Sequence, residues 1–380
     1  MSSKPRFVGE KVRLGDVATY VNGYAFKPSD YSDSGLPIVR IQNLTGNAYR
    51  TNRYEGTLPE KFAIQDGDIL ISWSASLGVF EWNQGPAWLN QHIFRVVFNK
   101  AMIDKRFFVH QARFLIQKSQ NLAHGATMKH LTKKVFETLP FLYLGLNNQI
   151  TIAEQLDALD TQINRAKRQI RFLDNLAKSR FVEMFLNSSW PIATIGECSM
   201  DIHYGTSEKA STEGEYVYLR MNNMGDDGSL DLSDIKRITL EGKALSNCLV
   251  RKGDLLFNRT NSREKVGKTC VFCLDEPMVI AGYIIRVRLD DRVDSTYLAA
   301  YMNLSSTKAL LRGMAKGAVH QANINAKQLA SIEFPLADIK AQKEFVSFVS
   351  QVDKSRFIAK QQIEKLQMLY DSLAQDYFGD

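Results

Sequence analysis

The chain has 380 residues, a hydrophobic content of 44% and a formal net charge of +7. A hydrophobic fraction of this size supports packed cores and excludes a disordered chain. No apolar run approaches the roughly 20 residues of a membrane-spanning helix, and the first residues, Met-Ser-Ser-Lys-Pro-Arg, lack the apolar stretch of a signal peptide. We therefore expect a cytoplasmic protein.

Residues 12–145 have the pattern of a mixed, strand-rich domain. Short runs of β-branched and aromatic residues, bounded by turn residues, predict strands at 38–41, 68–73 and 92–98. Residues 104–121 are predicted to form a helix with one face made of Phe107, Phe108, His110, Phe114 and Leu115.

Residues 149–186 have the pattern of one long helix. Glycine and proline are absent between Gln149 and Leu186, and a 4-3-4-3 spacing of mostly apolar residues matches the a/d positions of a coiled coil. At 1.5 Å per residue, about 38 residues extend roughly 57 Å. The predicted pairing positions are Ile152, Leu156, Leu159, Ile163, Ala166, Ile170, Leu173, Ala177, Arg180 and Met184.

Residues 190–337 repeat the plan of the first domain, with predicted elements at 216–224, 254–258, 279–289 and 295–312. The matches keep their order while the shift grows from 220 − 40 = 180 to 342 − 149 = 193, which indicates a duplication with small insertions. The matched pairs are Arg40-Ile-Gln-Asn with Arg220-Met-Asn-Asn, Gly67-Asp68 with Gly253-Asp254, Gly125-Ala126 with Gly317-Ala318, and Gln149 with Gln342.

The last segment repeats the heptad pattern. Adding 193 to each position of the first helix gives Phe345, Val349, Val352, Arg356, Ala359, Ile363, Leu366, Tyr370, Leu373 and Tyr377. An apolar stripe this narrow and long needs a partner, and the simplest partner is the other helix. Helices that merely cap each domain are the alternative, disfavoured because the pattern lasts about five heptads.

We therefore predict an α+β fold of two pseudo-repeated α/β domains, at 1–148 and 190–337, separated by two long helices, at 149–189 and 338–380. The heptads do not set the direction of pairing. We favour an antiparallel coiled coil, because closed twofold arrangements are the common outcome of duplication.

The net charge favours a polyanionic partner without requiring one. Residues 1–148 hold 18 basic and 11 acidic residues, a surplus of 18 − 11 = 7, whereas residues 190–337 are neutral with 18 of each. In the second domain, a phosphate-facing patch would therefore need local clustering of basic residues. Candidates are Lys236, Arg237, Lys243, Arg251, Lys252, Arg259, Arg263, Lys265 and Lys268.

The sequence contains no recognisable catalytic motif. Gly267-Lys268-Thr269 lacks the upstream glycine of a phosphate-binding loop, because Ser262 stands in its place. No GxGxxG follows a strand, and the six histidines show no paired metal spacing. Cys270 and Cys273 form a CxxC, but strand-like neighbours favour buried hydrophobes over zinc. We expect no catalytic residue, metal or cofactor in this chain; an unrecognised nuclease using Asp231, Glu241 and Lys243 is a weaker hypothesis.

Three pairs of loops carry side chains suited to DNA. Arg can bind guanine O6 and N7, and Asn or Gln can pair with adenine N6 and N7. Ordinary turn chemistry is the alternative for Asn223, which precedes Met224-Gly225, and solvated loop is the alternative for the others. The candidates in the first copy are Arg40, Gln42, Asn43, Ser72, Trp73, Ser74, Lys129 and His130; those in the second are Arg220, Asn222, Asn223, Asn258, Arg259, Thr260, Asn261, Arg263, Lys265, His320 and Gln321.

The second copy resembles a known family. Gly253-Asp254-Leu-Leu-Phe-Asn258-Arg259-Thr260-Asn261-Ser262, followed by Val266-Gly267-Lys268, is similar to the central motif of target recognition domains in type I restriction–modification specificity subunits. Residues 317–325, 332–336 and Gln342 resemble the end of such a domain and the start of its spacer helix. The first copy departs from the pattern, because Trp73-Ser74 replaces Arg-Thr.

The resemblance implies a non-catalytic DNA-specificity subunit of an adenine methyltransferase and restriction complex. Each domain would read one half of a bipartite site in double-stranded DNA, and the helices would set the gap. Two modification subunits carrying S-adenosylmethionine, and motor-nuclease subunits using ATP and Mg, would be the partners, with no membrane. The competing hypothesis is a coiled-coil scaffold that joins proteins without binding nucleic acid.

Overall fold

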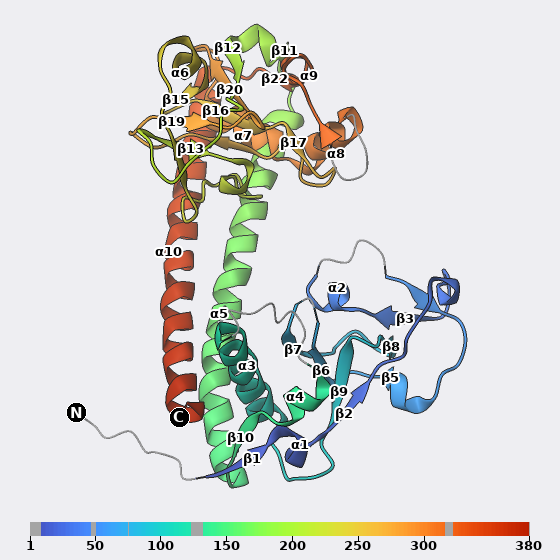
Figure 1. Cartoon of the computed structure of the whole chain (residues 1–380). Coiled ribbons are helices and arrows are strands. Elements are labelled where there is room, and N and C mark those ends of the chain that lie inside the picture. Colours follow the sequence, from blue (N-terminus) through green and yellow to red (C-terminus); the bar gives the residue numbers. More distant parts are fainter. Residues whose placement is uncertain (1–8, 47–50, 75, 123–131, 316–321, 380) are drawn as a thin grey trace, which may run out of the picture. The chain divides into compact units, whose positions relative to one another are not determined.

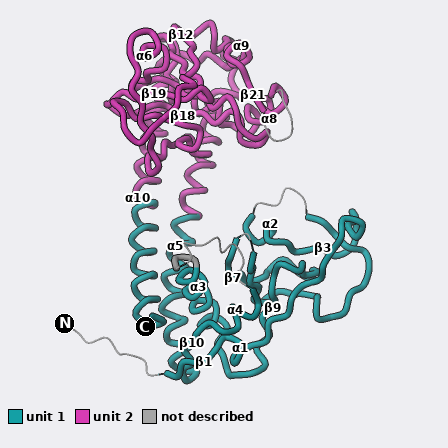
Figure 2. Tube along the Cα trace, viewed as in Figure 1, with its two compact units in different colours: residues 1–167, 360–380 teal, residues 168–359 magenta. Residues whose placement is uncertain are grey.

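The computed structural model describes residues 9–46, 51–74, 76–122, 132–315 and 322–379. The chain divides into two compact units, each holding one copy of the repeat and parts of both long helices. Residues 1–167 and 360–380 form unit 1, and residues 168–359 form unit 2 (Figure 2). In the described ranges, no helix is long and apolar enough to cross a membrane.

The described part of unit 1 is built on two small sheets and a ribbon (Figure 1). The first sheet is antiparallel, with strand order β2(Thr19–Asn22), β9(Ile93–Val97), β6(Ile69–Ser72), β7(Gly78–Glu81). The second pairs β3 parallel to β8, in the order β4(Arg53–Tyr54), β3(Leu36–Val39), β8(Ala87–Leu89), β5(Ala63–Ile64). The ribbon pairs β1(Glu10–Arg13) with β10(Pro140–Tyr143), and the helices are α1(Leu14–Val17), α2(Ile41–Leu44), α3(Lys105–Leu122) and α4(Lys133–Glu137).

Unit 2 repeats this arrangement. Its first sheet has the order β12(Ser199–Tyr204), β20(Ile284–Leu289), β16(Leu255–Asn258), β18(Thr269–Val271). Its second has the order β14(Lys236–Ile238), β13(Tyr216–Leu219), β19(Met278–Ile280), β15(Leu249–Val250), with β13 parallel to β19. Two ribbons, β11(Ile192–Thr194) with β22(Glu333–Pro335) and β17(Thr260–Asn261) with β21(Ala322–Asn323), accompany the helices α6(Gly242–Cys248), α7(Ser295–Met302), α8(Ser305–Met314) and α9(Ala326–Ala330).

Two predicted elements of the second copy are divided in the structure. The predicted helix at 295–312 ends at Met302 and restarts at Ser305, and the Asn303 side chain between them donates to the Thr269 carbonyl oxygen at 2.8 Å. The predicted strand at 279–289 is divided by the turn Ala281–Tyr283, which carries the chain from the second sheet to the first. An apolar run alone does not show where a chain changes sheets.

One tight turn precedes the central strand of both first sheets. Gly67 and Gly253 adopt φ values of +84° and +93°, a conformation that favours glycine. The following aspartates close the turn, because Asp68 Oδ2 accepts from the Gln65 amide at 2.9 Å and Asp254 Oδ2 from the Arg251 amide at 2.8 Å. The Gly-Asp repeat in the sequence therefore marks the entry into strands β6 and β16.

Two long helices pack together: α5(Leu146–Phe181), which continues in a π-helical turn at Val182–Leu186, and α10(Ile339–Phe378). In unit 1, Tyr377 on α10 donates to Gln155 near the start of α5. In unit 2, Arg356 and Asp174 form an ion pair at 2.6 Å, and the Phe181 and Phe345 rings lie 5.3 Å apart. Late residues of one helix thus meet early residues of the other, so the pair is antiparallel, as predicted.

The heptad positions lie along this contact. Of the twenty pairing positions, ten in each helix, all are buried or half-buried, whereas most of the intervening helical residues are exposed. The two charged positions are paired within unit 2, where Arg180 contacts Glu344 at 3.3 Å and Arg356 contacts Asp174. An arginine is therefore tolerated at a pairing position where a carboxylate of the other helix forms an ion pair with its guanidinium.

Both long helices take part in the hydrophobic cores of the two units. Ile152, Leu156 and Leu159 belong to the hydrophobic core of unit 1, together with Tyr370 and Phe378. Phe181, Phe185 and Phe345 belong to the core of unit 2. Each helix therefore contributes one part to each core, which is why the division falls inside both helices.

Candidate nucleic-acid interface

In unit 2, two of the predicted loops meet at one turn. The Ala281 amide donates to the Leu219 carbonyl oxygen at the end of β13, at 2.9 Å. Two residues along the turn, the Tyr283 carbonyl oxygen accepts from the Arg259 amide at 2.9 Å. The turn therefore joins the loop after β13, which begins at Arg220, to the loop after β16, which begins at Arg259.

Unit 1 uses the same backbone connections. The Asn90 amide donates to the Val39 carbonyl oxygen at 3.1 Å, and the Trp73 amide donates to the His92 carbonyl oxygen at 3.4 Å. Arg40 after β3 and Trp73 after β6 therefore occupy the places of Arg220 and Arg259. The two copies present one loop framework, with arginine at the first position in both and tryptophan in place of arginine at the second in unit 1.

The loop after β13 holds itself together by internal contacts. Asn223 is buried; its Oδ1 accepts from the Arg220 amide at 2.9 Å, and its Nδ2 donates to the carbonyl oxygens of Asp231 and Asp234. The Asn223 amide is therefore occupied by the turn, in agreement with the turn-chemistry interpretation. Arg220 and the exposed Asn222 both contact the Asp234 carboxylate, at 2.9 and 3.2 Å.

The matching loop of unit 1 has the same first turn contact. Asn43 Oδ1 accepts from the Arg40 amide at 3.0 Å, which is the same turn contact as in unit 2, and its Nδ2 donates to Thr51 Oγ1 at 3.3 Å. Gln42 is exposed on the short helix α2. Of these three predicted residues, Gln42 is the most accessible to a ligand.

The loop after β16 is divided into a buried base and an exposed tip. Asn258 and Thr260 are buried, and Asn258 Nδ2 is an unpartnered buried atom among the described residues. Asn261 is half-buried and its Oδ1 accepts from the Ser262 amide at 2.9 Å. Arg263 and Lys265 are exposed in the following turn, so they are the two predicted residues of this loop best placed for phosphates.

In unit 1, the loop after β6 corresponds to the loop after β16 and carries an aromatic residue, Trp73, at the position of Arg259. The Trp73 ring stacks on Phe94 with centroids 5.8 Å apart and an angle of 17°, and it lies 5.4 Å from the His92 ring. Its Nε1 is buried without a hydrogen-bond partner among the described residues. Ser72 and Ser74 are buried, and Ser72 Oγ donates to the Ser76 carbonyl oxygen at 2.5 Å, so neither serine is exposed to a ligand in this conformation.

Four predicted residues, Lys129, His130, His320 and Gln321, lie outside the described ranges. The structure adds residues that the sequence analysis missed: Tyr204, Tyr283 and Asn323 surround Arg259. They come from β12, the turn before β20, and β21, and no local motif marks them. Only the strand register places them together.

A half-buried lysine supports the same loop from α8. Lys308 Nζ donates to the Gly267 carbonyl oxygen, at the end of the turn that carries Arg263 and Lys265. Burial lowers the pKa of Lys308 to about 8, and the neighbouring Arg312 acts in the same direction. Lys268, immediately before β18, pairs with Asp226 at 2.7 Å. The loop is therefore tied to α8 and to the loop after β13.

Cys270 is buried in β18, and burial raises its pKa to about 12, as expected of an inert structural thiol. The described ranges contain no group of three or more His, Cys, Asp or Glu side chains that could hold a metal ion. Asp231, Glu241 and Lys243 are all exposed.

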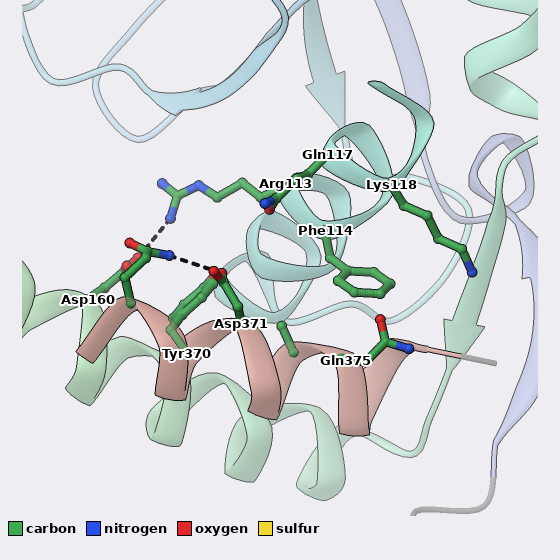
Figure 3. Close-up of a pocket in the computed structure, with 10 residues that line it drawn as sticks. Arg113, Phe114, Gln117, Lys118, Asp160, Tyr370, Asp371 and Gln375 are labelled. Atoms are coloured by element: carbon green, nitrogen blue, oxygen red, sulfur yellow. Dashed lines mark hydrogen bonds and ion pairs between the residues drawn. The ribbon is translucent and has the colours of Figure 1, made fainter. Parts of the chain in front are cut away.

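A cavity of about 470 Å³ lies in unit 1 where α3, α5 and α10 meet (Figure 3). Arg113 on α3 pairs with Asp160 on α5 at 2.8 Å across one side, and Phe114 faces Gln375 of α10. Beside it, the buried His110 bridges Tyr370 and Asp157, at 2.8 and 2.9 Å. These contacts join α3 to both long helices.

Two copies of one loop framework, joined to a pair of antiparallel helices, define a protein with two related ligand-facing surfaces. The family model described as type I restriction modification DNA specificity domain matches residues 9–171 and 201–368, which is most of the chain. The chain belongs to this family.

Curated relatives agree along the length of the chain. It is 23% identical over 383 residues to the type I restriction enzyme EcoBI specificity subunit of Escherichia coli, covering 90% of this chain and 78% of that protein. It is 22% identical to the StySPI specificity subunit of Salmonella potsdam, covering 95% and 86%.

Solved structures share the fold. A type I restriction-modification S subunit from M. genitalium aligns with a TM-score of 0.51 and 15% identity, covering 100% of this chain and 98% of that one. A chain from a structural study of type I restriction–modification complex assembly and conformational transition aligns with a TM-score of 0.50 and 18% identity over the full length of both. At these identities the likeness supports the fold alone.

Proposed function

We propose that this chain selects the DNA sequence on which a type I restriction–modification complex acts. Each recognition domain reads one half of a bipartite site in double-stranded DNA, and the paired helices set the number of unread base pairs between the halves. The observation that carries the proposal is the repeated loop framework. The backbone contacts of Arg40 and Trp73 recur at Arg220 and Arg259, while Gln42 and Trp73 of unit 1 stand where unit 2 has Asn222 and Arg259. A shared framework with different side chains is suited to reading two different short sequences.

Methylation and cleavage belong to partner subunits in this proposal. Two modification subunits would bring S-adenosylmethionine, and motor-nuclease subunits would bring ATP and Mg. The long helices offer surface for such partners, because several large apolar residues outside the pairing positions are exposed. In unit 2, Phe172, Phe357 and Ile358 are 66%, 61% and 64% exposed. Apolar exposure of this size is typical of surfaces that a partner covers. The complex would act in the cytoplasm, on the DNA there.

Phosphate contacts would supply most of the affinity, and base contacts the sequence preference. In unit 2, Arg263 and Lys265 suit the first role because they are exposed at the loop tip. Gln42 in unit 1 and Asn222 in unit 2 suit the second role, because both are exposed and carry amides that can pair with a base edge.

A domain exchange tests the proposal. Residues 190–337 are replaced by the second recognition domain of a relative, the chain is assembled with its modification subunits, and methylated sites are mapped across a genome. We expect one half of the methylated sequence to change while the other half and the spacer persist. The reciprocal exchange of residues 1–148 should change the other half. The chain without its partners should methylate and cleave nothing. A change in both halves, or in neither, would contradict the proposal.

A further inference from the structure

Arg259 is held in one orientation by three neighbours. Its guanidinium carbon lies 4.7 Å from the centre of the Tyr204 ring. Its Nη2 donates to Asn323 Oδ1 at 3.1 Å, and its Nη1 makes a long contact with the Gly282 carbonyl oxygen at 3.4 Å. Stacking on a ring and hydrogen bonding at both terminal nitrogens restrict the torsions of a long side chain that would otherwise be free.

The neighbours are themselves fixed by the fold. The Tyr204 hydroxyl accepts from the Ala326 amide at 2.8 Å, which attaches the ring to the start of α9. Asn323 lies on β21, which pairs with β17, and its Nδ2 donates to Thr260 Oγ1 at 3.1 Å. The support for Arg259 therefore comes from separate segments of unit 2.

This arrangement leaves part of the guanidinium uncommitted. Each terminal nitrogen carries two N–H groups, and among the described residues each has one hydrogen-bond partner. Within the described ranges, one N–H on each nitrogen therefore has no partner and can donate to a ligand. Arg259 is half-buried, beside Tyr283, which is 50% exposed. A half-buried, oriented fork with two available donors is better suited to one planar pair of acceptors than to a mobile phosphate.

Unit 1 has no guanidinium at the position that corresponds to Arg259. Trp73 makes the backbone contact that Arg259 makes, and its ring is stacked on Phe94. An indole offers one donor and an apolar face. The two domains therefore differ in chemistry at this framework position.

We propose that Arg259 reads a guanine in the half of the DNA site that unit 2 recognises, with Tyr204 and Asn323 as its positioning residues. This inference rests on the proposed function. Guanine O6 and N7 form the acceptor pair that an arginine fork fits in the major groove. Tyr204 and Asn323 act through Arg259, by presenting the fork already aligned, which reduces the ordering cost of binding.

The first experiment pairs a protein change with a base change. The assembled methyltransferase is measured on duplexes of its mapped site in which each guanine of the unit 2 half is replaced in turn by 7-deazaguanine, which lacks the N7 acceptor. For the wild type, one position should lower methylation by roughly 5- to 150-fold, the range of a good bidentate contact. Arg259→Ala should lower activity on the ordinary site by a similar factor and show little further loss at that position. Lys327→Ala, which removes an exposed cation of α9, is the matched control and should behave like wild type.

The second experiment tests the positioning residues by base preference. Methylation rates are compared between duplexes that carry guanine and duplexes that carry adenine at the same position. Tyr204→Leu and Asn323→Ala should reduce the ratio of these two rates, while every other position keeps its base preference. Tyr204→Phe, which keeps the ring, should restore most of the ratio that Tyr204→Leu loses. Arg259→Lys keeps the charge without the fork, and it should lose the guanine preference while retaining the salt dependence of binding.

Specific results would overturn the inference. A unit 2 half-site without a G·C pair would do so, as would equal losses from 7-deazaguanine in wild type and Arg259→Ala. These outcomes leave the proposed function standing, because the complex would still methylate a bipartite site. Failure of the assembled complex to methylate any bipartite site would instead refute the proposed function itself.

Discussion

Gln342 offers a sharp test of how each long helix is attached to its domain. Its side chain is fully buried, at 0% exposure. The Oε1 atom accepts from the Asp294 amide at 2.8 Å, and Nε2 donates to the carbonyl oxygens of Arg292 and Ala337, both at 2.8 Å. This one residue therefore joins the start of α10 to the segment before α7 and to the end of the loop after β22.

Gln342→Ala removes three hydrogen bonds and leaves buried backbone groups without partners. At about 0.5–1.5 kcal/mol each, the loss in free energy of unfolding is about 1.5–4.5 kcal/mol. For a unit of 359 − 168 + 1 = 192 residues, each kcal/mol corresponds to roughly 2–4 °C, so the melting temperature should fall by roughly 3–18 °C.

The assay is thermal unfolding of the full chain, combined with hydrogen exchange read by mass spectrometry. The amide of Asp294 and the first turns of α10 should exchange faster in Gln342→Ala. Gln351→Ala, an exposed glutamine of the same helix, is the matched control and should remain close to wild type. In unit 1, Gln149 makes the equivalent contacts with Asp104, Met102 and Leu144. In Gln149→Ala, the amide of Asp104 and the first turns of α5 should therefore exchange faster, while the matching amides of unit 2 should not. If Gln342→Ala and Gln351→Ala melt at the same temperature, this account of the attachment is wrong.

Two further predictions concern pH and salt. Burial lowers the pKa of His110 below its ordinary value of 6.5, so the neutral ring contributes stability that is complete above that value and is lost as the pH falls toward the lower folded pKa. The drop in stability of wild type between pH 7.5 and pH 5.5 should therefore exceed that of His110→Phe, and equal drops would exclude this role. For the salt dependence, DNA binding by the assembled complex is measured over a range of salt concentrations. Arg263→Ala and Lys265→Ala should each reduce the slope of log affinity against log salt concentration by about one, whatever the base sequence. An unchanged slope would show that the mutated residue does not contact a phosphate.

Heptad spacing and internal repetition were sufficient to predict the architecture. A spacing of 3.5 residues places Ile152, Leu156 and Leu159 on one face of a helix whatever the surroundings, and these residues are buried at the contact with α10. The repeat of Gly67-Asp68 at Gly253-Asp254 likewise predicted two matching turns, because the backbone requirement is local.

The candidate site was only partly predictable. Asn43 and Asn223 each follow an arginine by three residues, and in both turns the asparagine Oδ1 accepts from the amide of that arginine. The support of Arg259 by Tyr204 and Asn323 has no local pattern, since 259 − 204 = 55 and 323 − 259 = 64 residues separate the partners. Such contacts depend on strand register, which a sequence window does not contain.

The sequence by itself determined that the chain is a duplicated protein with two helices that must be paired, because periodicity and repetition are properties of neighbouring residues. Only the tertiary structure decided that the helices run antiparallel, since a heptad stripe satisfies either direction and the choice depends on contacts such as that of Arg356 with Asp174. The tertiary structure also decided which side chains share a loop surface, because β12, the loop after β16 and β21 bring Tyr204, Arg259 and Asn323 together only after both the sheet and the ribbon have formed.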